Sequence, residues 1–134
     1  VFPRFGSFVA KKLLKKVRAK VFGESPTFLV SGGSDILKET LEIINGLGYK
    51  LHNGYGMSEI GITSVDLSMQ AYKRIEGSIG KPFSQVEYKI SDEGFLLVRS
   101  KGLCNKIITK DGEILINKDE YFCTGDFANQ KETG

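Results

Sequence analysis

Residues 27–59 have the sequence TFLVSGGSDILKETLEIINGLGYKLHNGYGMSE, and this stretch decides the expected fold. An apolar run at 27–31 stops at Gly32-Gly33, as a buried strand does when it enters a tight turn. Apolar residues at helical spacing follow, and Gly48 is suited to the left-handed position that closes a helix. A second strand is expected over 49–53. The stretch therefore predicts a strand, a helix and a strand in one compact βαβ-like unit.

The helix of this unit is expected to begin at a cap supplied by Ser34 or Asp35, whose side chains can accept from the first free N–H groups. Its apolar side consists of Ile36, Leu37, Leu41, Ile44 and Leu47. Ligands of such units bind at the carboxyl ends of the strands. Two Gly-rich turns, at 32–33 and 54–56, are expected at those ends.

Upstream, residues 8–22 predict an amphipathic helix that ends at Gly23. The apolar stripe recurs every four residues and consists of Val9, Leu13, Val17 and Val21, with Leu14 beside them. The opposite face is basic and carries Lys11, Lys12, Lys15, Lys16, Arg18 and Lys20. We expect a buried stripe and a solvated basic face, and the alternative is contact with a membrane or a nucleic acid.

Downstream, the apolar pattern changes to a period of two. Residues 86–90 and 95–99 flank Ser91-Asp92-Glu93-Gly94 and predict a hairpin. A second hairpin is expected around Lys110-Asp111-Gly112, because an Asp-Gly pair favours two-residue primed turns. The expected fold class is α/β: a βαβ-like part of a larger α/β subdomain at 1–76, followed by a small antiparallel β-barrel-like subdomain at 77–134.

Bulk properties exclude several classes of protein. The 134 residues, 40% of them hydrophobic, suffice for one domain or a part of one, and the net charge of +3 indicates no nucleic-acid partner. Cys104, Cys123 and a single His offer neither a zinc quartet nor a disulfide framework. No apolar run is long enough for a transmembrane segment, and we expect a cytoplasmic protein with reduced thiols.

The densest chemical signal is Asn53-Gly54-Tyr55-Gly56-Met57-Ser58-Glu59. Its glycines allow close approach of a ligand, while an aromatic ring, a hydroxyl and a carboxylate suit a nucleotide and its magnesium ion. The simpler alternative is a Gly-rich turn in front of a helix. Residues 56–63 nearly match a phosphate-binding P-loop, but Ile62 stands where the lysine must be, so we reject that motif.

Two further features of the sequence are weaker signals. In Tyr121-Phe122-Cys123-Thr124-Gly125-Asp126 the carboxylate could accept two hydrogen bonds from a ribose, although turn chemistry alone explains Thr-Gly-Asp in most proteins. His52 has no partner pattern around it in the sequence, and we expect a structural residue there.

Four stretches in order resemble motifs of the adenylate-forming (AMP-binding) superfamily, acyl-CoA synthetase type: 31–34, 53–59, 77–82 and 121–126. The resemblance covers roughly residues 27–127 and corresponds to a fragment of the large N-terminal domain. In that family a carboxylate attacks the α-phosphate of ATP, which gives an acyl-adenylate and pyrophosphate. The acyl group then passes to the thiol of coenzyme A (CoA) or of an acyl carrier protein.

The resemblance implies that this chain is part of an AMP-forming acyl-CoA ligase that uses ATP, Mg²⁺ and CoA. Residues 53–61 resemble fatty-acid-activating members more than peptide synthetases, so a fatty or related acid is the expected substrate. The alternative is a non-catalytic nucleotide-binding or interaction module with the same scaffold.

The resemblance also implies roles for individual residues. Tyr55 would stack on the adenine, and Asp126 would hold the ribose hydroxyls. The catalytic pair would be Ser58, touching the phosphates, and Glu59, holding the magnesium ion. The residues expected to line the base through backbone or small side chains are Gly32, Gly33, Ser34, Asn53, Gly54 and Gly56. The last two would also leave room for the acyl substrate.

Several departures from the family pattern bear on activity. Ser58 stands where Thr is usual and keeps the hydroxyl, and Phe95 replaces a frequent Glu. The phosphate loop with its lysine and the C-terminal domain with the adenylation lysine are expected upstream and downstream, as missing parts of the same polypeptide. The isolated fragment is therefore expected to be inactive.

Overall fold

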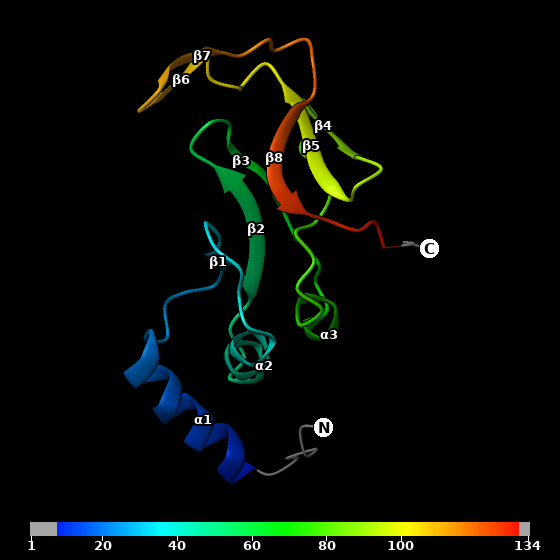
Figure 1. Ribbon diagram of the computed structural model, residues 1–134. Helices are drawn as coiled ribbons and strands as arrows, with labels where there is room; N and C mark the ends of the chain where they lie inside the picture. The colour runs from blue at the N-terminus through cyan, green and yellow to red at the C-terminus, as the bar shows by residue number, and fades with distance from the viewer. Residues whose placement is uncertain (1–7, 132–134) are drawn as a thin grey trace. The chain divides into compact units, whose positions relative to one another are not determined.

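The computed structural model of the chain describes residues 8–131, with side chains from residue 13 onward (Figure 1). Contacts group the chain into two compact units. Unit 1 consists of Val1–Gly54 and Val65–Gly80, and unit 2 consists of Tyr55–Ser64 and Lys81–Gly134. Within residues 8–131 no helix is both long and apolar enough to cross a membrane.

Unit 1 contains the strand–helix–strand motif that the sequence predicts. Strand β1 (Leu29–Ser31) pairs in parallel with β2 (Leu51–Met57), and α2 (Lys38–Gly46) connects them. The register places Leu29 opposite Leu51 and Ser31 opposite Asn53. The βαβ arrangement is confirmed, and it brings the residues that follow β1 beside the middle of β2.

The start of α2 differs from the prediction, whereas its end does not. Leu37 occupies the N-cap position and makes no side-chain cap, so the expected cap by Ser34 or Asp35 is wrong. Leu37 is therefore 71% exposed rather than part of the apolar side. Gly48 has the expected left-handed conformation, with φ of +87°, and its N–H donates to the Asn45 carbonyl.

The interior of unit 1 combines apolar and polar residues. Leu41, Tyr49 and Leu51 are buried together with Arg74, the last residue of the short helix α3 (Ala71–Arg74). Arg74 donates from Nε to Asn45 Oδ1 at 2.7 Å, and from Nη1 to two backbone carbonyls of residues 68 and 69. The pairing lets a cation lie in the core, because a buried charge must be hydrogen-bonded.

Helix α1 (Phe8–Val21) matches the predicted span, and Gly23 closes it by donating to the Arg18 carbonyl at 3.0 Å. The Tyr49 hydroxyl donates to the same carbonyl, and the Arg18 guanidinium lies 4.6 Å from the Tyr49 ring centre. The expected burial of the apolar stripe is wrong: its described members are 38–62% exposed (Leu13, Leu14, Val17 and Val21). Val9 lies outside the described side chains.

Unit 2 contains two open antiparallel sheets. One has the order β4-β5-β8, from β4 (Val86–Ile90), β5 (Phe95–Ser100) and β8 (Phe122–Phe127). The other is the hairpin of β6 (Lys106–Thr109) and β7 (Gly112–Leu115). Both predicted hairpins are confirmed, but the strands in the described part of the chain form no closed barrel.

The β6–β7 connection is not the predicted Asp-Gly primed turn. Thr109 pairs with Gly112, so the two loop residues are Lys110 and Asp111. A type I′ turn needs positive φ at both loop residues, and no described residue other than glycine has it. The Thr109 hydroxyl instead accepts from the Asp111 N–H at 3.2 Å and donates to the Gly112 carbonyl.

The expected Gly-rich turn at 54–56 is also wrong, because β2 continues through it to Met57 and returns as β3 (Gly61–Val65). The sheet order is β1-β2-β3. A side chain at Gly56 would lie 2.7 Å from the Ile62 Cα atom, so close strand packing requires glycine there. Strand, turn and strand over 56–63 also confirm that this segment is no P-loop. The division into domains at residue 76 stays a prediction.

Candidate functional site

Tyr55 and Asp126, 71 residues apart in the sequence, meet in unit 2. Tyr55 is half-buried in β2, and its hydroxyl donates to Asp126 Oδ2 from β8. Asp126 is exposed, and a carboxylate has lone pairs for further donors. The pair therefore presents an aromatic ring next to an acceptor that can bind additional hydroxyl groups.

Burial raises the pKa of the Tyr55 phenol to about 12, and its hydrogen bond to Asp126 adds to the rise. A phenolate beside a carboxylate would bring two negative charges together, which disfavours ionisation. The phenol is therefore a permanent donor near neutral pH. Its hydrogen bond to Asp126 Oδ2 holds the ring in place beside that carboxylate.

Asp126 lies in a bulge of β8, where the regular pairing with β5 is interrupted. Leu97 pairs with Cys123 and Phe95 pairs with Phe127, so β8 takes four steps where β5 takes two. The Thr124 hydroxyl fills the gap in the ladder: it donates to the Leu96 carbonyl at 2.9 Å and accepts from the Asp126 N–H at 3.1 Å. Gly125 has a φ of +80°, which favours glycine. The Thr-Gly-Asp triplet is thus an irregular strand segment, not the expected turn.

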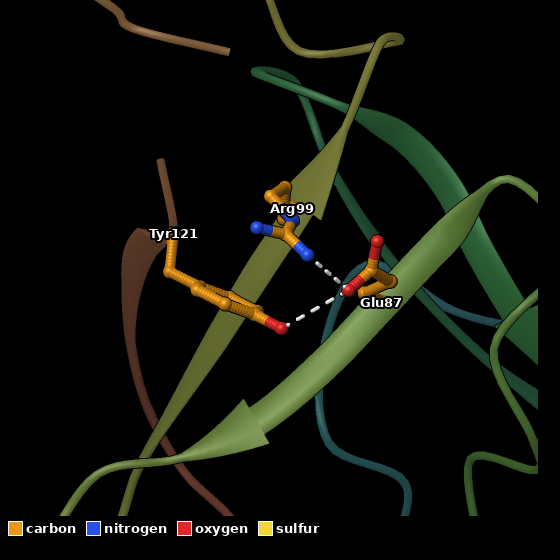
Figure 2. A network of polar contacts seen from close by, with 3 residues as sticks. All are labelled: Glu87, Arg99 and Tyr121. Atoms are coloured by element: carbon orange, nitrogen blue, oxygen red, sulfur yellow. Dashed lines mark hydrogen bonds and ion pairs between the residues drawn. The ribbon is translucent and has the colours of Figure 1, made fainter. Parts of the chain in front are cut away.

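The beginning of β8 is fixed by a polar network on the surface of unit 2 (Figure 2). Glu87 and Arg99 are cross-strand partners on β4 and β5 and form an ion pair at 2.5 Å. The Tyr121 hydroxyl donates to the same carboxylate oxygen of Glu87 at 3.1 Å, and its ring lies 4.7 Å from the Arg99 guanidinium. The hydrogen bond from the Arg99 guanidinium lowers the pKa of the Glu87 carboxyl, and the hydrogen bond from the Tyr121 hydroxyl lowers it further.

Ser58 and Glu59 lie in the loop between β2 and β3, also within unit 2. Ser58 is exposed and Glu59 is half-buried. The Glu59 carbonyl accepts from the Cys104 N–H at 2.7 Å, and the buried Ile60 closes the turn by donating to the Met57 carbonyl. The backbone of this loop is therefore fixed, while the hydroxyl and the carboxylate remain available to a ligand.

Glu59 is the side chain expected to hold magnesium, and the donor set fits the way Mg²⁺ binds with nucleotides. Among residues 8–131 there is no group of three His, Cys, Asp or Glu side chains able to enclose a metal ion. Mg²⁺ beside a nucleotide usually has one or two protein carboxylates, and phosphates and water supply the rest. One half-buried carboxylate is compatible with that arrangement.

The predicted backbone contacts of unit 1 follow β1. Gly32, Gly33 and Ser34 are exposed, whereas Gly54 is buried in β2. A side chain at Gly32 would lie 3.1 Å from the Gly54 carbonyl oxygen, which is tighter than most van der Waals contacts. The absence of a Cβ atom at residue 32 thus lets the chain after β1 pass close to β2.

Asn53 is 6% exposed, and its side chain is already engaged within unit 1. Its Nδ2 donates to the Gly77 carbonyl at 3.0 Å, and its backbone carbonyl accepts from Asp66 N–H at 2.8 Å. Asn53 therefore connects β2 to the segment after α3, which carries the third motif of the resemblance. No local sequence signal indicated this long-range contact.

His52 has the structural position that the sequence suggests. It is 2% exposed, its Nδ1 lies 2.6 Å from the Asp66 carbonyl oxygen, and its ring stacks on Phe28 at 4.4 Å. Because a carbonyl only accepts, Nδ1 carries the hydrogen. The two cysteines are free, Cys104 half-buried and Cys123 exposed, which agrees with the absence of a disulfide framework.

Sequence reasoning missed the polar side chains that hold these segments from a distance. In unit 1 they are Arg74 and Asn45, and in unit 2 they are Thr63, Ser64 and Tyr88. Their partners lie 24 to 29 residues away along the chain, so no motif of neighbouring residues could have identified them.

Comparison with known proteins supplies the context for this geometry. The model of the AMP-binding enzyme family matches residues 2–122. The long-chain-fatty-acid–CoA ligase FadD15 of Mycobacterium bovis is 29% identical over 123 residues, which cover 90% of this chain and 20% of that protein. The 2-succinylbenzoate–CoA ligase of Staphylococcus epidermidis is 29% identical over 114 residues, 79% of this chain and 24% of the ligase.

A solved structure supports the same fold. The crystal structure of coronafacic acid ligase from Pectobacterium brasiliense matches with a TM-score of 0.60 and 25% identity, over 91% of this chain and 26% of the ligase. The chain thus spans 20 to 26% of the length of these three proteins. The names of the three differ in the acid, so the comparisons do not single out one acyl substrate.

Proposed function

The chain belongs to the AMP-binding enzyme family, and we propose that it is part of an ATP-dependent ligase that activates a carboxylic acid as an acyl-adenylate. In the first step a carboxylate oxygen bonds to the α-phosphorus of ATP, and the bond to pyrophosphate breaks. In the second step the thiolate sulfur of CoA bonds to the acyl carbon, and AMP leaves with the electron pair of the mixed anhydride. The protein need supply no nucleophile in either step.

The observation that carries this proposal is the pair of Tyr55 and Asp126. The Tyr55 ring is half-buried on β2 and donates to Asp126, and the carboxylate belongs to β8 at its bulge. An adenosine offers a flat base and two vicinal hydroxyls, which an aromatic ring and a carboxylate recognise. We therefore assign Tyr55 to the adenine and Asp126 to the ribose.

The remaining predicted residues receive supporting roles in the same proposal. The exposed backbone of Gly32, Gly33 and Ser34 would contact the base, as would Gly54 and Gly56 of β2. Asn53 would act chiefly by holding this part of β2, since its amide already binds the Gly77 carbonyl.

Ser58 and Glu59 would serve the phosphates. The Ser58 hydroxyl is exposed and can donate to a phosphate oxygen, and Glu59 would hold Mg²⁺. A bound Mg²⁺ ion offsets the charge that develops on the pyrophosphate leaving group. We expect the upstream and downstream parts of the polypeptide to contribute the remaining cations.

The proposed substrate is a fatty or related acid, and the acceptor is CoA rather than an acyl carrier protein. The support is the similarity to a long-chain-fatty-acid–CoA ligase and to a succinylbenzoate–CoA ligase, both named for CoA. The cytoplasm is the proposed compartment, where the two free thiols would stay reduced.

The test uses the full-length polypeptide with ATP, Mg²⁺, CoA and a panel of fatty, aryl and amino acids. We expect release of pyrophosphate that depends on one class of acid, and formation of the matching acyl-CoA, detected by mass spectrometry. Binding of AMP without pyrophosphate release from any acid would instead favour the non-catalytic nucleotide-binding module. Absence of both would reject a nucleotide site at Tyr55 and Asp126.

A further inference from the structure

Three hydroxyl side chains of unit 2 meet, two of them buried and one half-buried. Thr63 and Ser64 belong to β3 and are 1% and 0% exposed, and Tyr88 belongs to β4. Tyr88 Oη lies 2.5 Å from Thr63 Oγ1 and 2.9 Å from Ser64 Oγ. The phenol therefore joins β4 to two consecutive residues of β3.

The cluster extends to Tyr55. Thr63 Oγ1 donates to the Tyr55 backbone carbonyl at 3.1 Å, while the Tyr55 phenol donates to Asp126 at its other end. Tyr55 is thus held at its backbone by the cluster and at its ring by β8. Both the direction of the ring and its position relative to Asp126 depend on these two attachments.

Packing alone does not account for the hydroxyl of Tyr88. Backbone contacts already attach β3 to the chain before β4: the Phe83 N–H donates to the Thr63 carbonyl at 2.9 Å, and Ser64 forms a bridge with Pro82. Residue 88 lies on the same side of β4 as Val86 and Ile90, where a phenylalanine would continue the apolar pattern. Tyr88 is half-buried, and a hydroxyl shielded from water costs desolvation unless it is paired, so its presence at this position points to the contacts it makes.

We propose that Tyr88 is a positioning residue for the nucleotide, because its hydroxyl fixes Thr63 and through it the Tyr55 backbone beside Asp126. The inference rests on the proposed assignment of Tyr55 and Asp126 to adenosine. It predicts that substitution of Tyr88 weakens binding of the nucleotide and leaves binding of the carboxylic acid and of CoA unchanged.

The first test replaces Tyr88 by Phe in the full-length polypeptide, which removes one oxygen atom and keeps the ring. Loss of a neutral hydrogen bond corresponds to about a three- to tenfold change in an equilibrium constant. We expect the KM for ATP and the Kd for AMP to rise by this factor, with the KM for the acid and for CoA unchanged. Tyr72→Phe is the matched control, because Tyr72 is 64% exposed on α3.

A second set of variants tests the route through Thr63. Thr63→Val removes the hydroxyl at nearly constant shape and should raise the Kd for AMP as Tyr88→Phe does. Thr63→Ser keeps the donor and should restore most of the affinity. Combining Tyr88→Phe with Thr63→Val should weaken AMP binding by less than the product of the separate effects, because both changes interrupt one chain of contacts.

The decisive measurement places Tyr88→Phe in a Tyr55→Ala background. If Tyr88 acts through Tyr55, the second change should alter the Kd for AMP by less than about twofold there. An equal loss in both backgrounds, or a rise in the KM for the acid as large as that for ATP, would overturn the inference and indicate a general structural role. Wild-type affinity in Tyr88→Phe would overturn it as well.

The failure of the proposed function would look different. In that case the wild-type protein would release no pyrophosphate with any acid, although the Kd for AMP could still be measured and the coupling between Tyr88 and Tyr55 still tested. Activity in the wild type with no effect of Tyr88→Phe would leave the proposed function intact and reject only the positioning role.

Discussion

The polar side chains that hold the two units differ in the partners they bind. In unit 1, Arg74 and Asn53 direct their donors mainly to backbone carbonyls, which fixes the course of the chain after β3. In unit 2, Tyr55 and Tyr88 pair with side chains of other strands. Substitutions in unit 1 should therefore cost mainly stability, whereas those in unit 2 should act mainly on the ligand.

The glycines show the same contrast. A Cβ atom at Gly80 would lie 2.5 Å from the Val65 carbonyl carbon and 2.7 Å from the Asp66 nitrogen, both within unit 1. A Cβ atom at Gly125 of unit 2 would have no atom within 4 Å. Glycine at residue 80 is required by contact with backbone, whereas glycine at residue 125 shapes the bulge that presents Asp126.

The largest expected effect is that of Gly80→Ala. The substitution combines a positive φ of +80° with a clash against backbone that cannot move independently. We expect a loss of roughly 3–5 kcal/mol in the free energy of unfolding, measured by urea unfolding of the full-length polypeptide. Gly33→Ala is the control, because residue 33 has a φ of +85° but open space around it, and it should cost only about 1–2 kcal/mol. Equal costs would contradict the role of the Val65 contact.

A somewhat smaller effect is expected for Arg74→Met, which keeps much of the volume and removes three hydrogen bonds. Carbonyls of residues 68 and 69 and the Asn45 amide oxygen would lose their partner. The expected cost in unfolding free energy is about 2–4 kcal/mol. Lys73→Met on the exposed side of α3 is the control and should be nearly neutral. A change in the Kd for AMP without a loss of stability would contradict the expectation that substitutions in unit 1 act mainly on stability.

Asp126→Ala probes unit 2. Removing the carboxylate takes away charge-assisted acceptors for the ribose, and we expect the Kd for AMP to rise about 10- to 100-fold. Because Asp126 is exposed, the unfolding transition should shift little. Asp92→Ala, in the exposed turn before β5, is the matched control. Unchanged AMP binding would refute the ribose assignment. A large loss of stability would mean that Asp126 acts mainly on folding, as we expect for Arg74.

The sequence predicted the parts of this arrangement that depend on neighbouring residues. Helical spacing and the closing glycine identified α2, and alternation identified the hairpin of β4 and β5. The predictions were wrong where contacts with backbone distant in the sequence determine the local conformation. Glycines at 54 and 56 indicated a turn, although the close approach of β3 requires glycine inside a strand.

For the candidate site, the resemblance named Tyr55 and Asp126 as ligand contacts, and these roles stay predictions. The structure adds that the two side chains are in direct contact, which the sequence did not indicate. The residues that hold Tyr55 in place could not be predicted. Tyr88 and Thr63, for example, are 25 residues apart in the sequence, and no motif links them. The buried stripe expected for α1 was wrong for a related reason: periodicity shows which side is apolar and not what covers it.

The smallest effect concerns the alkaline titration of Tyr55, one of five tyrosines in the chain. Its pKa is raised from 10.0 to about 12, so the folded state holds the proton more tightly than the unfolded state does. This contribution to stability is complete below about pH 10 and is lost as the pH rises from there to about 12. The difference in near-ultraviolet phenolate absorbance between the wild type and Tyr55→Phe isolates this one group.

We expect that difference to develop about two pH units above the ordinary tyrosine range. Asp126→Ala should lower the Tyr55 pKa only in part, because burial is the larger cause of the rise and the hydrogen bond the smaller one. A Tyr55 that titrates near 10 in the wild type would mean that its ring is neither half-buried nor bonded to Asp126. Unit 2 would then lack the side-chain pairing that distinguishes it from unit 1.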